Sequence, residues 1–391
     1  MVLIQDSPVD TRRVSAAVAA AGVSSFALLY APQPVLPQLA SAFRLAPGSA
    51  SLAIGVATGS LAVAVLPLAG LAGLVGRRRV ILWSVVVSAV VGLLLPLAPS
   101  FPVLLAMRAV QGVAIAGFAG VAAAYLADRL GTARLAGAVG AMIAGNSVGG
   151  MLGRLGAGFA AERLGWQGAL LVVAGVCVVC ALFTVLTLPP AAAVEPHAGT
   201  APVRGWRLGM VAPFAVGALA MGAFVALYNA AGFRLAAPPL SLTPAAASLV
   251  FLSYAMGTAS SAAAGRMAGR VGRSTALVTA LIVTAAGSVL TIPTALPLIA
   301  VGFAVLTAGF FAAHAIANAW VTAEAPAHAR GGAAGGYTLC YYLGSGAGGT
   351  AGSVVYGHAG WTWLIVLTSA WLLLAALAVL VSRNGATRVG G

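Results

Sequence analysis

The stretch LAGLVGRRRVI, residues 71–81, places three consecutive arginines between two long apolar runs, with no acidic residue near them. A related stretch, MAGRVGRSTAL, follows at residues 267–277, about half a chain length later. Arginine between apolar runs is typical of short cytoplasmic loops that connect membrane-spanning helices, and glycine allows the chain to reverse tightly there. The two stretches therefore predict two copies of one helix–loop–helix unit.

The composition excludes a water-soluble globular protein. Of the 391 residues, 61% are hydrophobic and 7% are charged, and the mean hydropathy is +1.04; a soluble domain carries roughly 25% charged residues. The formal net charge of +14 could indicate a nucleic-acid partner, but the arginines lie between apolar segments rather than on one domain. We therefore expect a polytopic membrane protein that contacts the lipid bilayer and binds no nucleic acid.

Apolar stretches of about 20 residues, the length that crosses a bilayer as a helix, occur about twelve times. They span approximately residues 14–36, 49–70, 79–97, 102–126, 133–160, 166–188, 208–231, 244–264, 274–292, 295–320, 331–356 and 361–382. Backbone in hydrocarbon must satisfy its own hydrogen bonds, so the stretches are expected to be helices and the fold all-α. The division of 274–320 into two spans depends on TIPTALP at residues 291–297.

The arginines predict the orientation of these spans. Fifteen lie in the termini and loops of one side, and only Arg44, Arg163 and Arg234 lie on the other. Because cytoplasmic loops collect positive charge, both termini are expected in the cytoplasm.

The two halves of the chain repeat each other. FALLY at 26–30 matches FVALY at 224–228, LAPGSASL at 45–52 matches LTPAAASL at 242–249, and a Gly-Trp pair occurs at 165–166 and 360–361. Each half therefore contains six helices in the same order. We expect six-helix bundles over residues 1–188 and 208–391, joined by a cytoplasmic linker at 189–207.

This pattern resembles the major facilitator superfamily (MFS), whose two parallel six-helix repeats hold a substrate site at their interface near mid-membrane. The basic stretches resemble its loop signature, roughly G-x-x-x-D-R-x-G-R-R, and AMIAGNSVGG at 141–150 resembles the antiporter signature G-x-x-x-G-P-x-x-G-G of its fifth helix. YAPQPVLP at 30–37 and YNAAGFRLAAPP at 228–239 are similar to a bacterial drug- and sugar-efflux-like (drug:proton antiporter-like, arabinose efflux) branch with twelve helices.

The resemblance implies a secondary active transporter of the bacterial inner membrane that works by alternating access. It implies export of a small organic solute, sugar- or drug-like, coupled to a proton gradient. We expect a monomer that uses no cofactor and no metal.

The chain departs from the family signatures in two places. Where the loop signature has Asp then Arg, the first copy has Gly73 and Leu74, and the second has Gly269 and Arg270; Asn146 occupies the place of the antiporter proline. In the family that aspartate helps to close the cytoplasmic side, so we expect a weaker inner gate, or one closed by Asp128 and Glu324 instead. The expected gate residues are Gly73, Gly76, Arg77, Arg78, Gly269, Gly272, Arg273, Asp128 and Glu324.

Polar residues inside the spans are candidates for substrate binding. They are Tyr30, Gln33, Arg108, Gln111, Asn146, Arg154, Tyr228, Asn229, His314, Asn318 and Tyr341. An arginine within the membrane usually faces a cavity or a partner, although Arg108 and Arg154 could also reach the outer interface. No acidic residue lies in the middle of a span, so His314 is the first candidate for a proton carrier. A hydrogen-bonded structural histidine is the alternative.

Two glycine rows follow the spacing of one helix face. They are Gly145, Gly149 and Gly153 in the fifth span and Gly344, Gly348 and Gly352 in the eleventh. Small residues let two helices approach closely. The rows therefore indicate either plain packing or the surfaces on which the two halves rock.

Other functions are also compatible with parts of the sequence. The same fold could take up a sugar or an organic anion, using the arginines. Ser345 in GSGAG with His314 or His358 could suggest an intramembrane serine hydrolase, but the glycine row and the duplication argue against an enzyme. A receptor or scaffold without transport is expected to carry a soluble domain, and the short loops argue against that alternative. The chain has no phosphate-binding G-x-x-x-x-G-K-[ST] motif, so a gradient is the expected energy source.

Overall fold

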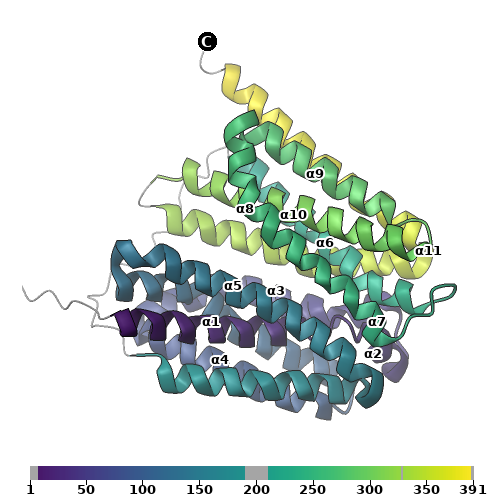
Figure 1. Ribbon diagram of the computed structural model, residues 1–391, viewed down its shortest axis with the longest axis horizontal. Helices are drawn as coiled ribbons and strands as arrows, with labels where there is room; N and C mark the ends of the chain where they lie inside the picture. Colours follow the sequence, from purple (N-terminus) through teal and green to yellow (C-terminus); the bar gives the residue numbers. More distant parts are fainter. Residues whose placement is uncertain (1–7, 190–209, 327–328, 389–391) are drawn as a thin grey trace, which may run out of the picture. The chain divides into compact units, whose positions relative to one another are not determined.

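The computed structural model describes residues 8–189, 210–326 and 329–388, and every regular element in that part of the chain is helical. The elements are α1 (Pro8–Tyr30), α2 (Leu36–Phe43), α3 (Pro47–Val75), α4 (Arg77–Leu94), η1 (Leu95–Leu97), α5 (Phe101–Thr187), α6 (Val211–Ala236), α7 (Pro244–Ser248), η3 (Leu249–Ser253), α8 (Tyr254–Val271), α9 (Arg273–Leu290), α10 (Leu296–Glu324) and α11 (Arg330–Arg388) (Figure 1). Within the described residues, ten helical segments are long and apolar enough to cross a membrane.

Two of these ten segments are long enough to cross twice. Arg134–Thr187 in α5 has 54 residues and Gly331–Ser382 in α11 has 52, so each would be about 80 Å long if straight, against a hydrocarbon core of about 30 Å. Gly165 and Gly360 interrupt them with φ values of 64° and 80°, and Figure 1 shows α11 running out and back. These are the glycines of the two Gly-Trp pairs, so the expected twelve crossings are confirmed.

The end of the first span was predicted wrongly. We expected a helix to residue 36, but α1 ends at Tyr30 and the short helix α2 follows, which the hydropathy pattern missed. Pro32 and Pro34 lie in the intervening turn, and proline has no amide hydrogen with which to continue a helix. The division of 274–320 was correct, because α9 ends at Leu290 and α10 begins at Leu296.

The chain forms two compact units by contact, and the first comprises residues 1–32 and 63–199. In this unit α1 packs along α5 by backbone contact at the glycine row. A β-carbon at Gly149 would lie 2.6 Å from the Cα of Val23, and one at Gly153 would lie 2.6 Å from the Cα of Ala27. Only glycine permits this approach, so the row serves packing inside one unit.

The second unit comprises residues 33–62 and 200–391. Its α6 packs along the glycine row of α11 in the same way, since a β-carbon at Gly344 would lie 2.7 Å from the Cα of Ala218. Helix α10 packs against α6, α8 and α9. Residues 33–62 belong to this unit although they precede the second repeat; the bundles 1–188 and 208–391 stay a prediction. Apart from Pro189, the predicted linker 189–207 lies outside the described residues.

Candidate functional site

Arg108 of α5 holds the end of α1. Its side chain is completely buried, and it donates hydrogen bonds to the backbone oxygens of Leu28, at 3.0 Å, and Leu29, at 2.5 Å. Carbonyl groups in the last turn of a helix have no amide partner within the helix. Arg108 therefore acts as a buried cap on α1, an arrangement that a helix C-terminus favours for a cation.

Gln111 completes this buried cluster, as the sequence spacing predicted. Its Oε1 accepts a hydrogen bond from Arg108, and its Nε2 donates to the Ser88 oxygen of α4 at 2.9 Å. Ser88 was not a predicted site residue, and its contribution comes from the backbone, which no side-chain pattern reveals. Arg108 thus directs three hydrogen bonds to the protein itself, which weakens the interpretation of Arg108 as a wall for an anionic substrate.

A second buried cation lies beside Tyr30 in the same unit. The Arg154 guanidinium carbon is 3.9 Å from the centroid of the Tyr30 ring, a distance typical of a cation–π interaction. Arg154 also donates to the Gly150 oxygen, one turn earlier, at 2.7 Å. Both side chains are buried. Asn146, a further turn earlier, lies against Gly22, and its buried Oδ1 has no hydrogen-bond partner among the described residues.

His314 of α10 pairs with a tyrosine that the sequence analysis missed. Its Nδ1 lies 2.8 Å from the Tyr337 hydroxyl, and its ring centroid is 4.7 Å from that of the predicted Tyr341. Tyr337 and Tyr341 are four residues apart on α11, so a shared helix face was the available signal. Asn318 was expected beside His314, but its side chain is exposed, whereas His314 is bonded to Tyr337.

Tyr228 of α6 lies in a packed aromatic cluster. It is completely buried, and its hydroxyl is hydrogen-bonded to Ser253 and, at 2.6 Å, to Thr307. The rings of Tyr254 and Phe303 lie edge-on to it, with centroids 5.1 and 5.0 Å away. The geometry supports a core role for Tyr228, with two hydroxyl partners that no motif indicated.

Gln33 and Asn229 meet each other within the second unit. Gln33 Nε2 donates to Asn229 Oδ1 at 2.7 Å, and each side chain is only 1% exposed. The Asn229 Nδ2 group is buried and has no acceptor among the described residues. The pair links the segment after α1 to α6.

The two basic loops form equivalent ion pairs. Arg77 pairs with Asp128 in the first unit, and Arg273 pairs with Glu324 at 2.5 Å in the second. The Arg273 guanidinium also stacks on the Trp320 ring, 4.3 Å from its centroid. Each pair joins the first residue of one helix to the end of another membrane-spanning segment, Phe101–Leu130 in the first unit and α10 in the second. The two acids therefore engage the loop arginines within each unit, and the predicted gate role of these residues stays a prediction.

The loop glycines serve the reversal of the chain. Gly76 and Gly272 separate α3 from α4 and α8 from α9, with φ values of 96° and 83° that L side chains rarely adopt. Gly73 and Gly269 replace the family aspartate, and a β-carbon at either position would meet no atom within 4 Å, which leaves room for a carboxylate.

Arg78, unlike Arg77, is bonded to the backbone rather than to an acid, because its Nε donates to the Leu188 oxygen at 2.8 Å.

Ser345 lacks the partner that a nucleophile requires. Its side chain is completely buried, and its Oγ has no hydrogen-bond partner among the described residues. His314 is bonded to Tyr337 instead. A serine hydrolase needs a base within hydrogen-bonding reach of the serine oxygen, so the described geometry gives that interpretation no support.

Known proteins are similar to this chain in sequence and in fold. The chain matches the family model of the Major Facilitator Superfamily over residues 18–233 and 219–389. It is 34% identical to the inner membrane transport protein YnfM of Escherichia coli, over 93% of this chain and 89% of that one. It is 32% identical to the uncharacterized MFS-type transporter YybF of Bacillus subtilis, over 93% and 92%.

More distant matches agree with this assignment. A chloramphenicol resistance protein of Streptomyces lividans is 29% identical over 60% of this chain and 59% of its own length. The crystal structure of a bacterial homolog of the human lysosomal transporter Spinster, inward-facing and unoccupied, superimposes with a TM-score of 0.80. That comparison covers 97% of this chain and 98% of the other at 16% identity. The chain belongs to the major facilitator superfamily and is a multi-pass membrane transporter with two six-helix repeats, not an enzyme.

Proposed function

We propose that the protein exports a small organic solute across the bacterial inner membrane in exchange for protons. Export is supported by the antiporter-like stretch at residues 141–150 and by the partial similarity to a chloramphenicol resistance protein. The charge of the loops supports a topology with both termini in the cytoplasm. Two bundles, residues 1–188 and 208–391, alternate access to one substrate as a monomer.

The observation that carries proton coupling is the hydrogen bond between His314 and Tyr337. His314 lies in the membrane-spanning helix α10, and Tyr337 lies in α11. Among the described residues of this unit, the one acidic side chain is Glu324, at the end of α10. Histidine is the side chain that ordinarily titrates near neutral pH. A change in its protonation changes its bond to α11, which is the coupling that alternating access needs.

The remaining predicted residues contribute to the proposed substrate site in different ways. Asn146 and Asn229 each carry a buried polar group without a partner among the described residues, so a substrate can supply the missing hydrogen bond. Tyr341 lies beside His314 and Tyr30 beside Arg154. Arg108, Gln111 and Tyr228 support the site by fixing helices. Gln33 positions Asn229 through the hydrogen bond between them. The exposed side chain of Asn318 contacts the substrate where the transport pathway is filled with water.

Purified protein in proteoliposomes with an internal pH-sensitive dye tests the proposal. Chloramphenicol, ethidium, arabinose and benzoate are each added under an imposed pH gradient. We expect at least one of them to cause proton movement in the wild type. His314→Gln should abolish proton movement but keep gradient-free counterflow of that compound, which shows that the variant still folds and binds.

His358→Gln is the matched control, because His358 is exposed and lies near the break at Gly360. It should retain wild-type proton movement. If His314→Gln behaves as this control does, His314 is not the proton carrier. If uptake rather than export follows the proton gradient, the assigned direction is wrong.

A further inference from the structure

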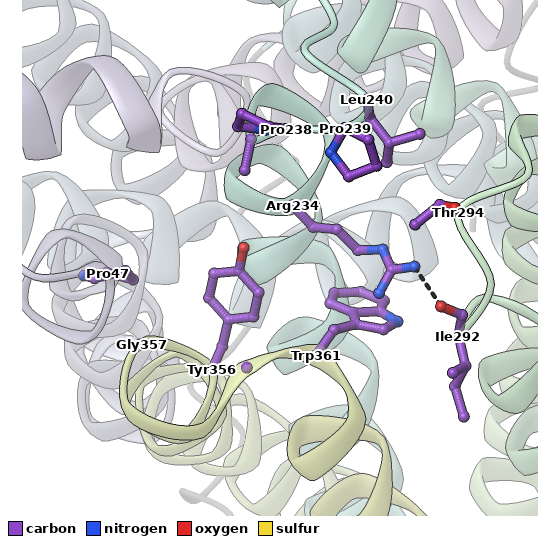
Figure 2. A pocket seen from close by; sticks show the side chains of 12 residues that line it. Pro47, Arg234, Pro238, Pro239, Leu240, Ile292, Thr294, Tyr356, Gly357 and Trp361 are labelled. Atoms are coloured by element: carbon purple, nitrogen blue, oxygen red, sulfur yellow. Dashed lines mark hydrogen bonds between the residues drawn. The ribbon is translucent and has the colours of Figure 1, made fainter.

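An open pocket of about 460 Å³ lies at the end of α6 in the second unit. Its walls are mainly apolar and are formed by Pro47, Pro238, Pro239, Leu240, Ile292 and Trp361, with Arg234, Thr294 and Tyr356 as polar members (Figure 2). This volume falls within the range of pockets that hold small organic molecules. None of the residues assigned above to substrate, proton or gate lines it.

Arg234 is held rigidly across this pocket. It lies in the last turn of α6, and its Nη2 donates to the oxygens of Ile292, at 2.8 Å, and Pro293, at 3.0 Å. Its guanidinium carbon is 4.7 Å from the centroid of the Trp361 ring. Trp361 is fixed in turn, because its Nε1 donates to Thr291 Oγ1 at 3.0 Å. A preorganised guanidinium loses little entropy when it binds a ligand.

The positive charge of Arg234 is not balanced by an acid of its own unit. The carbonyl oxygens of Ile292 and Pro293 accept its hydrogen bonds, and the Trp361 ring attracts the guanidinium. None of these groups carries a net charge. Among the described residues of the unit the one acidic side chain is Glu324, which pairs with Arg273 at the opposite end of α10, about 42 Å away along that 29-residue helix. The Nε of Arg234 is also buried without an acceptor among the described residues. A bound anion would supply the negative charge and the hydrogen-bond acceptor that this unit does not place beside Arg234.

We infer that this pocket binds a small organic monocarboxylate with an aromatic or branched aliphatic body. The carboxylate pairs with the Arg234 guanidinium, which matches carboxylate geometry well. The body lies against the proline, leucine, isoleucine and tryptophan walls. Figure 2 shows the Tyr356 ring beside the Arg234 stem, with its hydroxyl directed toward Pro238, where it can add one hydrogen bond to the ligand.

The position of the pocket suggests a site on the extracytoplasmic side. Arg234 lies at the helix ends opposite the Arg273–Glu324 pair, so the orientation proposed above places it outside. Only this placement depends on the proposed function. Binding to the purified protein requires neither transport nor a direction, so the two proposals can fail separately.

Titration calorimetry of the purified wild-type protein in neutral detergent tests the pocket, with benzoate as the probe. Benzyl alcohol serves as the uncharged analogue and inorganic phosphate as the anion without an apolar body. We expect saturable benzoate binding that is at least about tenfold tighter than binding of either comparison compound. Absence of saturable benzoate binding, or equal binding of benzyl alcohol, overturns the inference. Tighter phosphate binding overturns the carboxylate assignment.

Three variants locate the site. Arg234→Gln should weaken benzoate binding at least about tenfold, and Thr294→Phe, on an exposed loop residue, should block the pocket without disturbing Arg234. Arg163→Gln is the matched control, because Arg163 is an exposed arginine predicted on the same side of the membrane. Thermal unfolding verifies each fold. If Arg234→Gln is unfolded, Thr294→Phe decides, and unchanged benzoate binding in it overturns the site.

Discussion

Arg108, within the membrane-spanning segment Phe101–Leu130, donates to the backbone oxygen of Leu29 at 2.5 Å and so closes the end of α1. Other arginines use the same kind of partner. Arg13 donates to the Thr187 oxygen and Arg78 to the Leu188 oxygen, both at the end of α5. The chain has 20 arginines and six acidic residues, so carboxylates cannot satisfy most of its cations. Carbonyl groups at helix ends take their place.

Replacement of Arg108 should therefore destabilise the fold rather than change substrate specificity. Arg108→Gln leaves the Leu28 and Leu29 carbonyl groups without their buried donor, and each lost hydrogen bond to a charged group costs about 1.5–3 kcal/mol. We expect the Tm in detergent to fall by about 5 °C or more. Exposed Arg163→Gln should leave the Tm unchanged. An unaltered Tm with weakened substrate binding in Arg108→Gln would instead show that Arg108 contacts the substrate.

The glycine row of α5 predicts opposite effects of one substitution at two positions. Gly149→Ala pushes a methyl group into the α1 backbone at Val23 and should destabilise the protein by about 1–3 kcal/mol. Gly175→Ala, in the same helix, meets no atom within 4 Å and should stabilise it by about 0.5–1 kcal/mol. Thermal unfolding of the two variants side by side measures the difference. Equal shifts would mean that α1 does not depend on this row.

The pair of Arg273 and Glu324 should contribute little to stability. Both side chains are partly exposed, and exposed ion pairs are worth about 0–1 kcal/mol and weaken in salt. Glu324→Gln should lower the Tm by no more than a few degrees at low salt, and the difference should shrink at about 0.5 M salt, where screening acts over about 4 Å. Trp320 keeps Arg273 in place in the variant. A large loss that persists in salt would indicate a structural role instead.

Gly73→Asp restores the acid of the family loop signature at a position with open space around it. We expect the new carboxylate to strengthen closure of the cytoplasmic side. The measurement is the labelling rate of Asn318→Cys, an exposed position of α10, by a membrane-impermeant maleimide in inside-out vesicles. Labelling should become slower in the double variant. Gly73→Asn, which adds a side chain of the same size without the charge, is the control, and an unchanged rate in Gly73→Asp would show that the loop acid does not act on the gate.

Much of the fold followed from periodicity and repetition in the sequence. Apolar length predicted the twelve crossings, because a helix must match the bilayer thickness. The repeated Gly-Trp pairs marked the two breaks inside α5 and α11, although only the φ values of Gly165 and Gly360 show why glycine is required there. Hydropathy did not predict α2, because an eight-residue helix is too short to produce a membrane signal. Its boundaries depend on prolines and on packing against α6.

The candidate site was only partly predictable for a physical reason. Spacing along one helix predicted Arg108 with Gln111, since residues three or four apart share a face. It could not predict that Leu29 oxygen, Tyr337 or Thr307 would be the partner, because these come from other helices. The sequence shows which polar side chains lie inside membrane spans, where an unsatisfied polar group costs free energy. Tertiary structure decides which of them satisfy each other.

The sequence by itself determined that this protein crosses the membrane twelve times in two repeats, because hydropathy and charge act on each segment separately. It also determined where glycine must stand in the loops and rows. Only the tertiary structure decided that the rows pack α1 on α5 and α6 on α11 within a unit, and that Arg234 lacks an acidic partner among the described residues of its unit. Those outcomes depend on distances between helices, which local interactions along the chain do not specify.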